Sequence, residues 1–130
     1  MLIVEDSEAD VFLMREAIEA KALSVSIHVV RDGEQAIRYF DQADADAGAP
    51  CPALVILDIN LPRQQGGEVL HHMRRSLRCG NAFVIAVSTS DSARDREQMM
   101  QLGANAFFRK PSEYAAFMAL GDVVKGLLAL

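Results

Sequence analysis

The sequence is poor in cysteine, has no tryptophan and carries no excess of positive charge. Its 130 residues include two cysteines, and 13 Lys and Arg against 18 Asp and Glu leave a formal charge of -5. Cys51 and Cys79 form no CxxC pair, which argues against a zinc site or a thioredoxin-type redox pair, and we expect both thiols to be reduced and structural. The acidic balance offers no basic surface to nucleic acid, so we expect protein or small-ion partners.

Long apolar runs are also absent. No stretch reaches the roughly 18 apolar residues of a membrane-spanning helix, and the N-terminus lacks the basic segment and apolar core of a signal peptide. We therefore expect a cytoplasmic protein without membrane contact. The composition, with 51% hydrophobic and 24% charged residues, is ordinary for a globular protein. Because domains usually contain about 100 to 200 residues, residues 1–130 are predicted to form a single domain.

The histidines follow no metal-ligand pattern, because none lies in an HExxH helix or at ligand spacing from a cysteine. His71 and His72 are expected on a solvated helix face. The basic residues that follow them are likewise expected to point outward: Arg74, Arg75 and Arg78.

One apolar stretch near the middle of the chain ends in a carboxylate. Val55 to Leu57 leads into Asp58, and Pro62 follows within a few residues. A continuous β-branched run bounded by turn residues is typical of a strand buried on both faces of a parallel sheet. Asp58 would then lie at the carboxyl edge of that sheet, where α/β proteins bind ligands. The alternative, for Asp58 taken alone, is a turn cap.

Apolar runs alternate with helical repeats along the chain. Strands are predicted at residues 2–4, 25–30, 53–58, 83–87 and 104–108, and helices at about 7–22, 34–40, 69–77, 91–102 and from 112 onward, with a surface loop at 41–52. This alternation predicts a single-domain α/β fold with right-handed crossovers and helices on both sheet faces. We predict a flavodoxin-like, doubly wound five-stranded parallel sheet of strand order 2-1-3-4-5 with five helices.

Short polar signals mark two helix ends. Ser7 is a predicted N-cap of the first helix, and Asp10 three residues later suits a partial capping box. Gly103 is a predicted C-cap of the fourth helix.

Three carboxylates would meet where the first and third strands end. In the predicted order these strands are neighbours, which brings Glu5, Asp6 and Asp58 together. Like charges this close repel one another unless a cation is present, and an all-oxygen site suits Mg²⁺. The alternative is a set of acidic turn residues neutralised by solvent.

The fourth strand contributes a hydroxyl and the fifth a cation to the same edge. An anion beside Asp58 would meet Ser88 as a hydrogen-bond donor and Lys110 as a point charge. Phosphoryl transfer depends on such positioning and charge neutralisation, and a carboxylate can act as its nucleophile. The pattern therefore indicates a site that forms an aspartyl phosphate.

Four motifs in the sequence resemble those of a known family. They are similar, in order and spacing, to the signature blocks of two-component response-regulator receiver domains over essentially the whole chain: Val4-Glu5-Asp6-Ser7, Asp58-Ile59-Asn60-Leu61-Pro62, Val87-Ser88-Thr89-Ser90 and Phe107-Phe108-Arg109-Lys110-Pro111.

The resemblance implies a role for each matching residue. Asp58 would accept a phosphoryl group from a sensor histidine kinase, in self-catalysed chemistry and not as a classical enzyme. Asp6 and Asp58, with the backbone carbonyl of Asn60, would bind Mg²⁺, and Glu5 would act mainly through water.

Ser88 would be the switch hydroxyl and Phe107 the switch aromatic. Lys110 would bind the phosphoryl group, and the bond between Lys110 and Pro111 would be a cis peptide.

Further stretches resemble the stand-alone regulators of bacterial phytochrome histidine kinases: residues 2–13, Leu61-Pro62-Arg63 and Leu102-Gly103-Ala104-Asn105-Ala106. The sequence departs from the common receiver pattern at Gln65-Gly66, where many relatives have Asp-Gly, and at Asn81-Ala82-Phe83, where Ile-Pro is common.

Two other functions share parts of this pattern. A phosphohydrolase of the haloacid dehalogenase type also uses a strand-end Asp, but it needs a second Asp two positions later, where this sequence has Asn60. A receiver cut from a DNA-binding regulator is the other alternative.

Output is expected to be protein contact, since no helix-turn-helix follows the last predicted helix. We expect coupling from Ser88 and Phe107 to a surface formed by the fourth helix, fifth strand and fifth helix. A wide apolar stripe on the last helix suggests a homodimer there: Met118, Val123 and Leu127.

Overall fold

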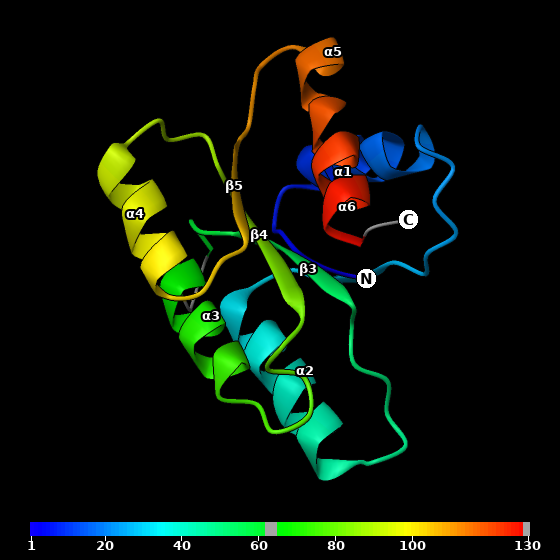
Figure 1. Ribbon diagram of the computed structural model, residues 1–130, viewed down its shortest axis with the longest axis vertical. Helices are drawn as coiled ribbons and strands as arrows, with labels where there is room; N and C mark the ends of the chain where they lie inside the picture. Colours follow the sequence, from blue (N-terminus) through cyan, green and yellow to red (C-terminus); the bar gives the residue numbers. More distant parts are fainter. Residues whose placement is uncertain (62–64, 129–130) are drawn as a thin grey trace.

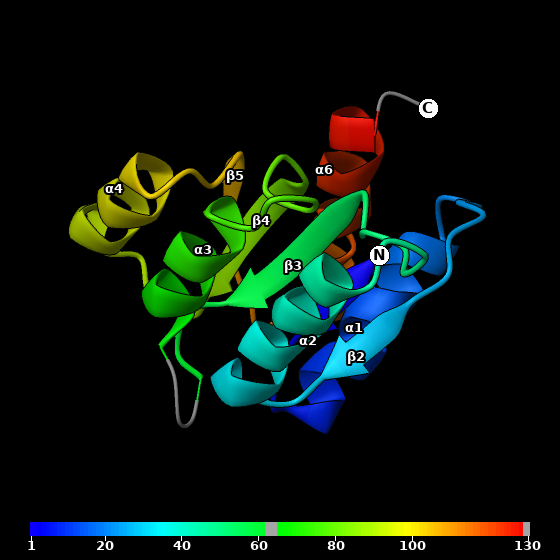
Figure 2. The same cartoon turned by 90° about the horizontal axis from the view of Figure 1, so that it is seen from below.

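The computed structural model describes residues 1–61 and 65–128, which form three layers with a parallel sheet in the middle. The sheet contains β1 (Leu2–Val4), β2 (His28–Val30), β3 (Leu54–Asp58), β4 (Phe83–Ser88) and β5 (Ala106–Arg109). Their order is β2-β1-β3-β4-β5, and every neighbouring pair is parallel (Figure 2). The predicted fold class and strand order are confirmed.

Helices cover both faces of the sheet (Figure 1). One face carries α2 (Gly33–Ala45), α3 (Gly66–Arg74) and α4 (Ala93–Gln101), and the other carries α1 (Glu8–Glu19), α5 (Tyr114–Phe117) and α6 (Ala119–Leu128). The last of the five predicted helical regions is thus divided at Met118 into two segments. None of the helices in the described ranges is long and apolar enough to cross a membrane.

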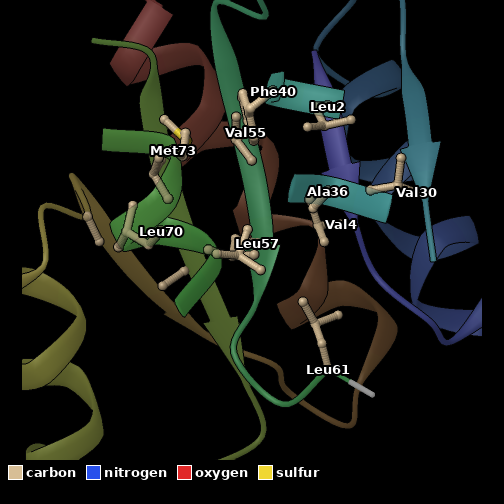
Figure 3. Packing of buried hydrophobic residues seen from close by; sticks show 14 of the residues in the cluster. Leu2, Val4, Val30, Ala36, Phe40, Val55, Leu57, Leu61, Leu70 and Met73 are labelled. Carbon is tan, nitrogen blue, oxygen red and sulfur yellow. The ribbon is translucent and has the colours of Figure 1, made fainter. Parts of the chain in front are cut away.

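Successive side chains of each strand point to opposite faces of the sheet, and they form two separate apolar clusters. On β3, Val55 and Leu57 pack beneath α2 and α3, whereas Leu54 and Ile56 pack against α1 and α6. Figure 3 shows the first cluster, in which Phe40 of α2 and Met73 of α3 lie over the strand. β3 is buried over its whole length, and its carboxyl end leads directly into the site described below.

Several predicted boundaries differ from the structure. The second strand is shorter than residues 25–30, and the fifth begins at Ala106 instead of Ala104. α1 ends at Glu19, before a turn in which Ala22 has a φ of 53°. α2 continues to Ala45, into the predicted loop, because Ala43 extends its buried face by one more turn.

The expectation of reduced cysteines was wrong, because Cys51 and Cys79 form a disulfide with a Cα–Cα distance of 5.3 Å. Each cysteine lies just before a strand, and Leu54 of β3 pairs with Phe83 of β4. The sheet register therefore brings the two connections together at its amino end. Spacing rules for cysteine motifs do not detect such a pair, since 28 residues separate the two positions.

The prediction of an outward basic helix end holds for Arg75 and Arg78, which are exposed, but not for the half-buried Arg74. The Arg74 guanidinium donates to three backbone carbonyls, those of Gly80, Ala82 and Gly103. Arg78 donates in the same way to carbonyls at the end of α2 and beyond it: Ala43, Asp46 and Ala49. Arg74 thus satisfies half-buried carbonyls, and Arg78 links its own segment to the end of α2, roles that only the tertiary fold reveals.

The histidine prediction was right for His71, which is exposed. His72 is partly exposed and lies 2.8 Å from the Asp41 carboxylate of α2. That contact joins α2 to α3 on the helical surface.

Candidate functional site: a carboxylate and lysine cluster at the sheet edge

The structure brings the three predicted carboxylates together at the carboxyl ends of β1 and β3. Val4 pairs with Leu57, so the next residues, Glu5 and Asp58, emerge side by side. Carboxylate oxygens of Glu5, Asp6 and Asp58 all lie within 4.8 Å of one another. Glu5 and Asp58 are buried, whereas Asp6 is exposed. The cluster therefore has a buried floor and one open side.

Lys110 reaches this cluster from the end of β5. Its Nζ donates to Glu5 Oε1 at 2.6 Å and to Asp58 Oδ2 at 3.2 Å. Its backbone N–H donates to the Ser88 carbonyl at 2.7 Å, which extends the β4–β5 ladder by one step. Burial alone would lower the pKa of Lys110, but bonds to Asp10 and Glu5 and the charge of Asp58 raise it. The ammonium is therefore charged throughout the physiological range.

Glu5 is the most perturbed acid of the cluster. Burial raises its pKa to about 8, with a further increase from the neighbouring Asp58 and an opposing effect from Lys110. At neutral pH the cluster therefore retains a proton on Glu5 when no cation is bound. A divalent cation held by the cluster would favour the deprotonated form of Glu5 through its charge.

Asn60 and Ser88 form a second set of contacts around Asp58. The backbone N–H of Asn60 donates to Asp58 Oδ1 at 2.9 Å, and its side-chain Nδ2 lies 3.3 Å from Ser88 Oγ. Ser88 is fully buried, and its Oγ also accepts from the N–H of Ser90 at 3.0 Å. The predicted hydroxyl thus lies at the same sheet edge as Asp58, one strand away. The expected carbonyl contact of Asn60 with a metal stays a prediction.

Gly66 allows α3 to begin directly against the strand that ends in Asp58. A Cβ at this position would lie 2.4 Å from Ile59 Cα and 2.8 Å from the Asp58 carbonyl oxygen. Only glycine fits so close to the backbone. From the sequence, Gly66 was noted only as part of a departure from the common receiver pattern, and the need for glycine at this position was missed. The sequence signal that could have revealed this need is a glycine at the first position of a helix, where N-capping does not require glycine.

Two predictions concerned the neighbourhood of Lys110. Phe107 pairs with Ala86 and is half-buried against the cluster beneath α2 and α3, so its expected role as a switch aromatic stays a prediction. The expected cis bond before Pro111 was wrong, because no cis peptide occurs in the described ranges. Trans is the lower-energy isomer for most bonds to proline, and the turn after β5 is built with it here.

Asp10 is a member of the cluster that its sequence position did not indicate. Its Oδ2 lies 2.8 Å from Lys110 Nζ, on the edge of a cavity of about 610 Å³. That cavity is also lined by Thr89, Arg109 and Lys110. It gives access from solvent to the Lys110 side of the site.

The comparisons with known proteins agree with this geometry. Residues 1–120 match the family described as "Response regulator receiver domain". The chain belongs to this family. The resemblance stated from the sequence is therefore confirmed. Receiver domains are phosphoacceptor regulators that accept a phosphoryl group on an aspartate and bind Mg²⁺ or Mn²⁺ at an acidic site.

Individual relatives include other response regulators. Response regulator Rcp1 of Synechocystis is 30% identical over 110 residues, 85% of this chain and 75% of that protein. The Mn²⁺-bound form of Rcp1 has a TM-score of 0.83 at 26% identity, covering 96% of this chain and 90% of that one.

Two further solved structures are named as phytochrome regulators. The phosphorylated cyanobacterial phytochrome response regulator RcpA has a TM-score of 0.86 at 29% identity, covering 98% and 92% of the two chains. The bacteriophytochrome response regulator RtBRR is 35% identical with a TM-score of 0.75, covering 91% and 72%.

Proposed function

We propose that the protein acts in phosphorelay signalling by accepting a phosphoryl group on Asp58 from a sensor histidine kinase. The observation that carries this proposal is the contact between the Lys110 ammonium and Asp58 Oδ2, with Ser88 on the strand between them. A nucleophilic carboxylate beside a cation and a hydroxyl has what phosphoryl transfer needs, namely positioning and charge neutralisation.

In the proposed reaction a carboxylate oxygen of Asp58 attacks phosphorus while the bond from phosphorus to the donor breaks. The donor on a kinase is a phosphorylated histidine, whose imidazole leaves as the acyl phosphate forms. Lys110 and Ser88 bind phosphoryl oxygens, by charge and by a hydroxyl donor respectively. The transfer needs no other catalytic protein, so phosphorylation and later hydrolysis are self-catalysed by the receiver.

The donor set of the cluster fits Mg²⁺. All three groups offer carboxylate oxygen, the kind of ligand that Mg²⁺ takes, and these oxygens lie within 4.8 Å of one another. Asp6, Asp58 and the backbone carbonyl of Asn60 would hold the ion, with Glu5 acting through water. Bound Mg²⁺ would neutralise the charge of the phosphoryl oxygens.

The partner is proposed to be a bacteriophytochrome-type histidine kinase. Support comes from relatives that are named as phytochrome or bacteriophytochrome response regulators and align with nearly the whole chain. We further propose that this receiver acts in the cytoplasm and binds neither nucleic acid nor membrane.

We propose that the surface formed by α4, β5 and α5 contacts the downstream protein, and that Ser88 and Phe107 couple phosphorylation of Asp58 to this surface. A homodimer through this surface is part of the proposal. The stripe that suggested it is half-buried, because Met118, Val123 and Leu127 pack against the α1 side of the core. Support now comes from Met100 of α4 and Tyr114 of α5, which are 43% and 54% exposed. A monomeric mass by sedimentation at micromolar concentration, with and without a phosphoryl mimic, would exclude the dimer.

Labelling with a small phosphodonor tests the proposed reaction. Protein incubated with Mg²⁺ and acetyl phosphate should gain the mass of one phosphoryl group, and chelation of Mg²⁺ or Asp58→Asn should prevent the gain. Asp95→Asn, which removes a carboxylate from α4, is the matched control and should be labelled like the wild type. Steady turnover of a generic phosphomonoester would instead favour a phosphohydrolase, a reaction for which Asn60 supplies no general acid.

A further inference from the structure

The carboxylate of Asp10 is not used by the helix that carries it. Asp10 is the third residue of α1, and its backbone N–H donates to the N-cap Ser7 Oγ at 3.3 Å. In a complete capping box, the side chain at this position would accept from the N–H of the N-cap. Here that N–H donates to Glu5 Oε2 at 3.2 Å instead. Glu5 has replaced Asp10 in the capping contact and left the Asp10 carboxylate available.

Asp10 instead binds Lys110, which lies 100 residues later in the chain. An ammonium has three N–H donors, and Lys110 directs bonds to three carboxylates: Glu5 at 2.6 Å, Asp10 at 2.8 Å and Asp58 at 3.2 Å. The bond to the acceptor aspartate is the longest. All donors of the lysine are therefore engaged before any phosphoryl group arrives.

The three carboxylates differ in how readily they can release the lysine. The Glu5 side chain is 0% exposed and that of Asp58 is 7% exposed, whereas that of Asp10 is 26% exposed. Water can solvate Asp10 from the cavity that it lines with Lys110 and Arg109. A buried carboxyl group that loses its hydrogen bond from the lysine has no such compensation. Asp10 is therefore the partner that Lys110 can exchange at least cost.

We infer that Asp10 is a positioning residue that holds the Lys110 ammonium in the unphosphorylated state and competes with the phosphoryl group for it. The inference rests on the proposed phosphoryl acceptance by Asp58. When the group binds, one N–H of Lys110 passes from Asp10 to a phosphoryl oxygen, and Asp10 turns to solvent. No covalent bond changes in this exchange. The negative charge of Asp10 also opposes an incoming anion, so both effects weaken phosphoryl binding and slow its arrival.

Binding of beryllofluoride, an anion that mimics a phosphoryl group on aspartate, tests the inference. Affinity is measured by ¹⁹F NMR titration with Mg²⁺ present, for the wild type and for Asp10→Asn. The variant should bind about three- to tenfold more tightly, because a charge-assisted bond no longer competes. It should also be labelled faster by acetyl phosphate. Asp10→Glu keeps the charge and should stay within about twofold of the wild type.

The matched control is Asp122→Asn. Asp122 lies on α6, its side chain is 66% exposed, and it pairs with Lys21 at 2.5 Å. The Asp122→Asn substitution removes the same charge from the molecule as Asp10→Asn and should leave beryllofluoride affinity unchanged. If Asp10→Asn bound like Asp122→Asn, or more weakly than the wild type, the competing role of Asp10 would be overturned. If the wild type itself neither bound beryllofluoride nor accepted a phosphoryl group, the proposed function would fail, and the inference with it.

Discussion

Lys110 donates to Asp58 at 3.2 Å although β5 and β3 are not neighbours in the sheet. β4 lies between them and ends in Ser88, so the lysine side chain reaches past one strand end to meet the carboxylate at another. Glu5 lies on the far side of Asp58, at the end of β1. The site is thus distributed over four consecutive strand ends of the sheet. Its parts are separated by up to 105 residues in sequence, and only the sheet order unites them.

Protonation of Glu5 predicts that the metal-free protein becomes less stable as the pH rises. The pKa is about 8 in the fold against an ordinary value of 4.5, so between these values the folded state binds more protons than the unfolded chain. This contribution to the free energy of unfolding is complete below pH 4.5 and is lost as the pH rises through about 8. Urea unfolding at pH 5, 6, 7 and 8 with a chelator present measures it.

Glu5→Gln should flatten that dependence, because glutamine does not titrate. The control is Glu19→Gln, which changes an exposed carboxylate at the end of α1 and should keep the wild-type slope. Equal slopes for Glu5→Gln and the wild type would show that Glu5 does not carry the proton. Added Mg²⁺ should also reduce the slope in the wild type, since the charge of the ion favours the deprotonated form of Glu5.

Arg74→Ala is predicted to lower the free energy of unfolding by about 2 to 4 kcal/mol. The guanidinium satisfies the carbonyls of Gly80, Ala82 and Gly103, and its loss leaves half-buried acceptors without that donor. The adjacent Arg75 is exposed, so Arg75→Ala should change stability by less than about 0.5 kcal/mol. Denaturant titration of both variants measures the difference. Similar effects from the two substitutions would contradict the assigned contacts.

Removal of the disulfide is predicted to destabilise the fold without abolishing labelling at Asp58. Closing a loop between Cys51 and Cys79 restricts the unfolded chain, and cross-links of this size typically stabilise by about 2 to 4 kcal/mol. The double variant Cys51→Ser, Cys79→Ala should unfold at lower urea than the oxidised wild type and match the reduced wild type. An unchanged midpoint on reduction, or two free thiols in unreduced protein, would refute the cross-link.

The features that sequence predicted well share one physical basis. Apolar runs that end in a polar residue indicate both the strand and its carboxyl edge, so Glu5, Asp58, Ser88 and Lys110 could be assigned to one site from their sequence positions alone. The alternation of strands and helices predicted the parallel sheet, and the strand order was taken from the flavodoxin-like topology. Local periodicity was enough for these residues, because their strand positions determine where their side chains lie.

The features that sequence missed depend on contacts between distant segments. The position of Asp10 in the first turn of α1 suggested a capping contact with Ser7, but in the fold Glu5 makes that contact. No local pattern indicates the bond between Asp10 and Lys110. The disulfide depends on the register of β3 against β4, and the Arg74 contacts depend on the turn at Gly103. The extent of α2 depended on Ala43, whose burial is set by the sheet beneath it. In each case a second, distant element decides the role of the residue.

The central claim is that a phosphoryl group is carried by Asp58 as an acyl phosphate. The most direct test is to label the protein with acetyl phosphate and Mg²⁺, reduce it with borohydride and locate the modified residue by peptide mass spectrometry. Borohydride converts a phosphorylated aspartate to homoserine but leaves phosphoserine and free aspartate unchanged. The account predicts homoserine at position 58 and at no other aspartate. Homoserine elsewhere, or stable phosphate on Ser88 with Asp58 unmodified, would contradict it.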